Sequence, residues 1–219
     1  MEKGTIHRIR REINSLDSMM TPDVRRIGRK YFREVKGLPK NHILDICQEL
    51  LDSGTWAERI IAFQWAFQLR KRYEKEDFNT FERWLKAHVT GWSSCDDLCT
   101  HAMGELLHQF PELLPKVKEW TSSENMWKRR GAAVTMVYPI RRGKYLEVVF
   151  EIADSLFHDD EELVLKGYGW MLKEASVTYR REVYDYVMKN RATMPRTALR
   201  YALEKMPEHM RKKAMETSL

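Results

Sequence analysis

The segments LVLKGYGWMLKEA (163–175) and IIAFQWAFQLRKRY (60–73) carry apolar residues at the spacing of an α-helix. Apolar side chains that recur every third or fourth residue form one face of a helix, whereas a half-buried strand alternates at every second residue. Such alternation is scarce here, and the most strand-like stretch, VTMVYPI (134–140), continues a helix-compatible segment. The patterns predict an all-α protein of about ten to twelve helices.

The expected helix starts recur at a nearly constant interval. They fall near Trp56, Trp92, Trp127, Val164 and Thr197. The interval of about 36 residues is close to that of a two-helix repeat. Repeats of this kind stack side by side into an α-solenoid, which presents one continuous concave face.

Corresponding positions of successive repeats should line up along that face. In three repeats a tryptophan and a charged residue would then lie at equivalent edges of the array. The pairs are Trp56 with Arg59, Trp92 with Asp96, and Trp127 with Arg130. A repeated tryptophan commonly packs between helix pairs. We favour this interpretation for Trp56 and Trp127.

Composition limits the class of protein. Of 219 residues 43% are hydrophobic, which suffices for a packed core, and no apolar run approaches the ~18 residues of a membrane span. The charged N-terminal segment MEKGTIHRIRREINS (1–15) does not resemble a secretory signal. Three cysteines without a disulfide pattern fit a reducing cytosol. We therefore expect a single domain, residues 1–219, in the cytoplasm, associated with the nucleoid if the organism is prokaryotic.

Basic residues are in excess and are spread along the chain. Lysine and arginine number 38 against 32 aspartates and glutamates, a formal net charge of +6. Any single cluster is commonly a solvated helix end, where cations are favoured. Clusters that recur along the whole chain suit a long ligand such as nucleic acid better than a small one.

The stretch GWSSCDDLC (91–99) has two interpretations. In the first, Ser93 or Ser94 is the N-cap of a helix, and one of the following aspartates supports the cap and the helix dipole. In the second, Trp92 and Asp96 project from the edge of the array. An electron-rich ring beside a carboxylate suits a substrate that becomes cationic during reaction, as in glycosidic bond cleavage through an oxocarbenium-like state.

Three blocks of the sequence resemble the AlkD family of DNA alkylation repair glycosylases, which are built from HEAT-like helical repeats. The blocks are GWSSCD (91–96), SENMWKRRGAAV (123–134) and VLKGYGWMLKEA (164–175). Their order and spacing also fit, and weaker similarity covers nearly the whole chain. The resemblance implies a HEAT-like α-solenoid with a concave basic groove, acting as a monomer on duplex DNA that contains alkylated purines.

The resemblance also implies the catalytic residues. Two tryptophans and one aspartate line the family's cleft beside the lesion, and the matching positions are Trp92, Asp96 and Trp170. The implied reaction is excision of cationic N3- or N7-alkylated purines, without flipping the base into a deep pocket. The role requires the Asp96 carboxylate to lie unneutralised between the two indole rings.

Four basic residues are expected to bind DNA. Arg130 matches a family arginine on the DNA-binding face, and the neighbouring Arg129 and Lys128 are expected to share its role. Lys173 stands where bacterial members often carry arginine. It keeps a phosphate contact but loses the bidentate fork of a guanidinium.

Other functions remain open on the sequence. A non-catalytic binder of damaged, bent or branched DNA fits the basic clusters, although the retained Asp96 favours excision. A helical scaffold for protein partners fits the repeats. Cys95, Cys99 and His101 lie close together, with Cys47 and His108 as loose further ligands, but buried reduced cysteine is the commoner case. We expect no metal and no cofactor.

Overall fold

The computed structural model describes residues 2–216, and this part of the chain is helical without any β-strand. Its α-helices are α1 (Glu2–Asn14), α2 (Thr21–Val35), α3 (Lys40–Asp52), α4 (Trp56–Gln68), α5 (Asp77–His88), α6 (Trp92–Asp97), α7 (Gly104–Gln109), α8 (Leu114–Glu119), α9 (Met126–Thr135), α10 (Val137–Ile140), α11 (Leu146–Ser155), α12 (Glu162–Thr178), α13 (Arg180–Asn190), α14 (Arg196–Leu203) and α15 (Glu208–Met215). The all-α prediction is confirmed.

Short non-α turns divide several of these helical runs. Three 3₁₀ turns are η1 (Arg70–Arg72), η3 (Pro111–Leu113) and η4 (Trp120–Ser122), and η2 (Leu98–Met103) is a π-helix. Because η2 joins α6 directly to α7, a single helical run extends from Trp92 to Gln109. The described residues therefore contain more separate α-helices than the ten to twelve expected from sequence patterns.

The repeat predicted from helix starts is present. Helices α2, α4, α6, α9, α12 and α14 begin at Thr21, Trp56, Trp92, Met126, Glu162 and Arg196, at intervals of 34 to 36 residues. The start at Thr21 extends the series by one repeat toward the N-terminus. A spacing this regular places equivalent residues of successive helices at equivalent heights.

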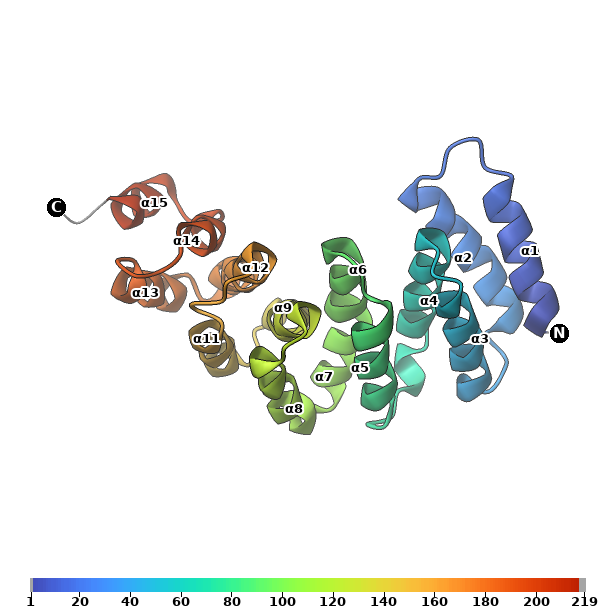
Figure 1. Ribbon diagram of the computed structural model, residues 1–219. Coiled ribbons are helices and arrows are strands. Elements are labelled where there is room, and N and C mark those ends of the chain that lie inside the picture. Colours follow the sequence, from blue (N-terminus) through green and yellow to red (C-terminus); the bar gives the residue numbers. More distant parts are fainter. Residues whose placement is uncertain (1, 217–219) are drawn as a thin grey trace.

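These six helices form one layer, which we call the repeat-start layer. Each contacts the next in order along the chain, from α2 to α14. The intervening helices α1, α3, α11 and α13 each pack against a member of this layer. Figure 1 shows the resulting curved array, with the two termini at opposite ends. The starts of the repeat-start helices therefore follow one another along the array.

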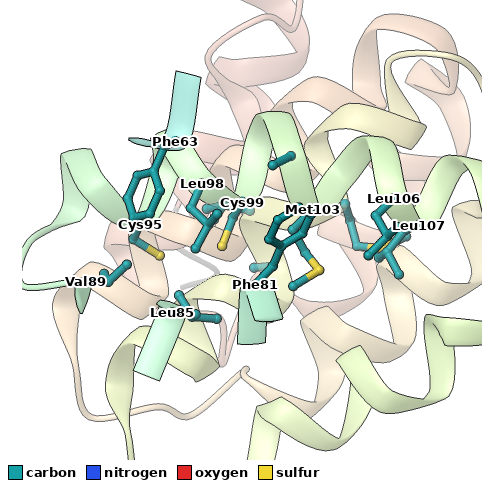
Figure 2. Close-up of a cluster of buried hydrophobic side chains, with 14 of the residues drawn as sticks. Phe63, Phe81, Leu85, Val89, Cys95, Leu98, Cys99, Met103, Leu106 and Leu107 are labelled. Carbon is teal, nitrogen blue, oxygen red and sulfur yellow. The ribbon is translucent and has the colours of Figure 1, made fainter. Parts of the chain in front are cut away.

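The core runs continuously between the layers. Figure 2 shows one part of it, where Phe63 of α4 and Leu85 of α5 lie near Cys95 and Cys99. All four side chains are almost completely buried. Apolar side chains on the inward faces of these helices thus hold α6 and η2 in place. The opposite face of α6 does not take part in this packing.

Two tryptophans expected in the interior differ in environment. Trp127 is partly buried and packs against the core, as predicted. Trp56 is 40% exposed, so the prediction that it packs between helix pairs is wrong. It is the first residue of α4, and the inward positions of that helix are filled by smaller apolar side chains and by Trp65.

No helix in the described part of the chain is both long enough and apolar enough to cross a membrane.

Candidate active site

The start of α6 presents Trp92 and Asp96 on one side of the helix. The two residues are four positions apart, which is the spacing of neighbours on a helical face. The helix begins at Trp92 with Gly91 as its N-cap, and no side chain caps it. Ser94 instead donates its hydroxyl to the Gly91 carbonyl oxygen at 2.9 Å. The prediction of a serine cap supported by Asp96 is therefore wrong, and the Asp96 side chain is free for another role.

Arg130 of α9 holds the Asp96 carboxylate. The Arg130 Nε donates to Asp96 Oδ1 at 3.0 Å, and Nη2 donates to Oδ1 at 2.8 Å and to Oδ2 at 2.9 Å. Nη1 donates to the Leu163 carbonyl oxygen. The expectation of an unneutralised Asp96 is wrong, because its charge is balanced by a guanidinium that is itself only 5% exposed.

The protonation of Asp96 reflects two opposing influences. Burial raises the pKa of the Asp96 carboxyl, and the charge of the adjacent Asp97 adds to the rise. The charge and hydrogen bonds of Arg130 lower it, but the net pKa remains above the ordinary value. Burial penalises the charged form, while a nearby cation favours it. Arg130 thus opposes the effect of burial and favours the ionised form of a largely buried carboxyl.

Arg130 fits beside α12 because Gly167 faces it. A Cβ at position 167 would lie 3.3 Å from the Arg130 Cγ, tighter than ordinary contact. Gly169 faces α14, where a Cβ would lie 2.9 Å from the Ala198 carbonyl oxygen. These two glycines allow α12 to pack closely between α9 and α14.

The two indoles share one open cavity with the carboxylate. The cavity has a volume of about 370 Å³ and is lined by Trp92, Asp96, Arg130, Leu163, Lys166, Trp170, Lys173 and Tyr201. Trp92 is 58% exposed, and Trp170 is half-buried against the core. The structure thus brings together residues of α6, α9, α12 and α14 that lie far apart in the sequence.

Trp170 is oriented by a buried carboxylate. Its Nε1 donates to Glu174 Oε1 at 3.0 Å. The Glu174 carboxylate also accepts from Arg141 Nε at 2.9 Å and from Lys205 Nζ at 2.9 and 3.0 Å. These donors outweigh burial and lower the pKa of Glu174 to about 2. The Trp170 indole is thus hydrogen-bonded to a carboxylate that does not line the cavity and whose charged form is strongly favoured.

The four basic residues expected on the DNA-binding face are not equivalent. Arg130 and Lys173 line the cavity, and Lys173 Nζ is paired with Glu204 at 2.9 Å. Arg129 is bonded to Asp159 at 2.6 Å, and Lys128 to Glu82 at 2.9 Å, and neither lines the cavity. A role for these residues in DNA binding remains a prediction.

The cysteines lie in the core. Cys47, Cys95 and Cys99 are buried and free, and burial raises the pKa of Cys47 and Cys95. Within residues 2–216, the histidine, cysteine and carboxylate side chains form no group of three with the geometry of a metal site.

Sequence reasoning missed several residues of the site. Leu163, Lys166 and Tyr201 line the cavity, and Glu174 fixes an indole. Glu174 could have been predicted to contact Trp170, because residues four positions apart are neighbours on one face of a helix. No sequence pattern could have predicted that Tyr201 of α14 lines the cavity, because its position depends on the close packing of α12 and α14.

Comparisons with known proteins agree with this geometry. The sequence model of a family described as DNA alkylation repair enzyme matches residues 13–206. A search of curated proteins finds no significant match.

Two solved structures are similar in fold. One is a predicted DNA alkylation repair enzyme from Enterococcus faecalis, with a TM-score of 0.74, 19% identity and 87% of each chain covered. The other is AlkD2 from Streptococcus mutans, with a TM-score of 0.71 and 19% identity, covering 95% of this chain and all of that one. Because the family match spans most of the sequence, this chain belongs to the DNA alkylation repair enzyme family.

Proposed function

We propose that this protein is a DNA glycosylase that hydrolyses the N-glycosidic bond of cationic N3- or N7-alkylated purines in duplex DNA. The observation that carries the proposal is the Asp96 carboxylate, which lines an open cavity together with Trp92 and Trp170 and is held by Arg130. Family membership supports a role in DNA alkylation repair. The glycosylase chemistry is inferred from the residues of the cavity.

The proposed reaction requires the protein chiefly to stabilise the positive charge that develops on the deoxyribose. An alkyl group on a purine ring nitrogen makes the base a cation, so the base departs as a neutral molecule once the C1′–N bond breaks. The deoxyribose becomes oxocarbenium-like, and a carboxylate stabilises that charge. Water adds to C1′ and releases a proton, leaving a free base and an abasic site. Asp96 would stabilise the cation and orient the water.

The indoles suit the same cationic centre. The face of a tryptophan ring attracts positive charge. Trp92 is largely exposed, whereas the Trp170 indole is hydrogen-bonded to Glu174, so the two rings line the cavity in different environments. The cavity is open at the surface, and three of its lining residues carry positive charge: Arg130, Lys166 and Lys173. This charge suits a substrate that remains within the duplex, since phosphate contacts supply much of the affinity for DNA.

An excision assay tests the proposal. Duplex DNA treated with a methylating agent is incubated with wild type, and free 3-methyladenine and 7-methylguanine are quantified. Asp96→Asn should reduce the single-turnover rate about 100-fold or more, the usual loss when one electrostatic stabiliser of a transition state is removed. Asp159→Asn is the matched control, because Asp159 also pairs with an arginine of α9 but lies outside the cavity. No release by wild type would remove the enzymatic proposal.

The alternative is a non-catalytic binder of damaged, bent or branched DNA. Its motivation is that Asp96 is ion-paired, and a carboxylate engaged with arginine can serve to position that arginine for a phosphate. Equal DNA binding by wild type and Asp96→Asn, without excision from any alkylated substrate, would favour this function.

A further inference from the structure

Exposed apolar side chains gather at the starts of three successive repeat-start helices. Among the described residues, the large hydrophobic side chains that are exposed are Met19, Met20, Trp56, Trp92 and Val177. Met19 and Met20 directly precede α2, Trp56 begins α4, and Trp92 begins α6. Exposed apolar groups that cluster mark contact surfaces more often than scattered ones do.

A second cavity lies beside Trp56. Its volume is about 90 Å³, and it is lined by Thr21, Arg25, Trp56, Arg59, Ile60, Phe63, Ser93, Ser94 and Asp97. By the same measure the cavity is about a quarter of the size of the cavity at Asp96 (about 370 Å³).

The repeat relates this cavity to the proposed active site. Trp56 is the first residue of α4, as Trp92 is the first residue of α6. Four positions further, α4 has Ile60 where α6 has Asp96. The second cavity therefore has the aromatic group of the active site without its carboxylate, which suits binding without bond cleavage.

Arg59 carries a charge that no acid of the described residues balances by an ion pair. Its Nη2 donates to the Gly54 carbonyl oxygen at 3.2 Å. Its buried Nε has no hydrogen-bond partner in the described part of the chain, and burial lowers the pKa of Arg59. The unbalanced guanidinium charge favours an anion beside Arg59, because charge-assisted hydrogen bonds from arginine to phosphate are strong.

The other two charged residues of the cavity, Arg25 and Asp97, form an ion pair, although Asp97 Oδ2 is buried without a hydrogen-bond partner in the described part of the chain. Arg25 Nη2 donates to Asp97 Oδ1 at 2.7 Å, which leaves the Arg59 charge in excess. The cavity thus combines one uncompensated cation, the exposed hydroxyl residue Ser93 and the rim of an indole. A phosphate group with an attached sugar has matching chemistry, since phosphate oxygens accept hydrogen bonds and the sugar offers an apolar face.

We propose that Trp56 and Arg59 form a second DNA subsite, one repeat before Asp96, which takes a deoxyribose phosphate of the duplex backbone. The phosphate lies against Arg59, and the sugar packs on the Trp56 indole. The inference rests on the proposed function in taking DNA as the ligand. Adjacent packed helices lie roughly 8–10 Å apart, which is about three base-pair rises, so one duplex can contact both sites.

Equilibrium binding of an undamaged fluorescent duplex at several salt concentrations tests the subsite. Arg59→Gln should reduce the slope of log affinity against log salt by about 0.9, the value for one phosphate contact. Arg181→Gln is the matched control, because it removes the same charge from a side chain that is 92% exposed on α13. It should leave the slope unchanged.

The indole is tested separately. Trp56→Ala should weaken binding about fivefold without changing the salt slope, because it removes apolar contact and no charge. Trp56→Phe should restore much of the affinity. Val177→Ala, which shortens another exposed apolar side chain (58% exposed), should bind as wild type. Thermal unfolding checks that each variant is folded.

The outcomes separate this inference from the proposed function. Wild-type salt slopes and affinities in both Arg59→Gln and Trp56→Ala, with excision by wild type intact, would overturn the subsite alone. Duplex binding by wild type with the expected variant effects, but without release of alkylpurines, would overturn the glycosylase proposal and support the subsite. Absence of duplex binding by wild type would overturn both.

Discussion

Replacing Arg130 by methionine should change both the stability of the protein and the pH dependence of excision. Arg130 makes three hydrogen bonds to Asp96 at 2.8 to 3.0 Å. In Arg130→Met, the influences that remain on the carboxyl are burial and the charge of Asp97, and both raise its pKa. The pKa of Asp96 should therefore rise further above its ordinary value.

The magnitude follows from the burial of the pair. The side chains of Arg130 and Asp96 are 6% and 17% exposed. Removing one partner of a buried ion pair costs about 3–5 kcal/mol, because the other charge is left without compensation. Since Asp96 keeps some contact with solvent, we expect a loss of about 3 kcal/mol at neutral pH. Arg130→Met/Asp96→Asn should recover part of it, because the isolated charge is gone.

Two measurements check this prediction. Urea unfolding at neutral pH measures the loss of stability. Single-turnover excision rates measured over a range of pH show where the rate falls on the acid side of the profile, which we call the acid limb. In the proposed mechanism excision requires ionised Asp96, so the acid limb should move to higher pH in Arg130→Met. Arg129→Met removes the neighbouring arginine of the same helix, whose side chain is 19% exposed and bonded to Asp159, and should lose stability without moving the acid limb. An unchanged limb in Arg130→Met would refute the role assigned to the pair.

Two further predictions concern α12. Glu174→Gln should lower the excision rate more than the affinity for DNA and should shift the indole N–H resonance of Trp170, because the charged acceptor of that group is lost; an unchanged resonance would contradict the positioning role. The pKa of Glu174 is lowered from 4.5 to about 2, so its stabilising contribution of about 3 kcal/mol is complete above pH 4.5 and lost as pH falls toward 2. Urea unfolding should accordingly show that wild type and Glu174→Gln differ most at neutral pH and converge in acid. Gly169→Ala should destabilise the fold by about 1–3 kcal/mol, because the new Cβ would lie 2.9 Å from the Ala198 carbonyl oxygen. Thermal unfolding measures this loss. The control Gly4→Ala, whose Cβ would meet nothing within 4 Å, should not show it.

The sequence determined the helices and their repeat. Apolar spacing and the punctuation between segments depend on neighbours along the chain, so the starts near Trp56, Trp92 and Trp127 could be read directly. The grouping of Trp92, Asp96 and Trp170 came from the family resemblance, and the structure places all three around one cavity. Local pattern alone would have assigned Trp170 to the core and Asp96 to a helix cap.

Only the tertiary structure decided the electrostatic state of the site. The bond from Arg130 to Asp96 spans 34 residues, and the bond from Lys205 to Glu174 spans 31. Both depend on how one helix seats against the next, through close approaches such as that at Gly167, and no local pattern encodes that distance. The exposure of Trp56 was hidden for the same reason. The spacing of residues along the sequence predicts which side chains share a helical face. Their burial and ion pairing depend on the packing of helices that lie far apart in the chain.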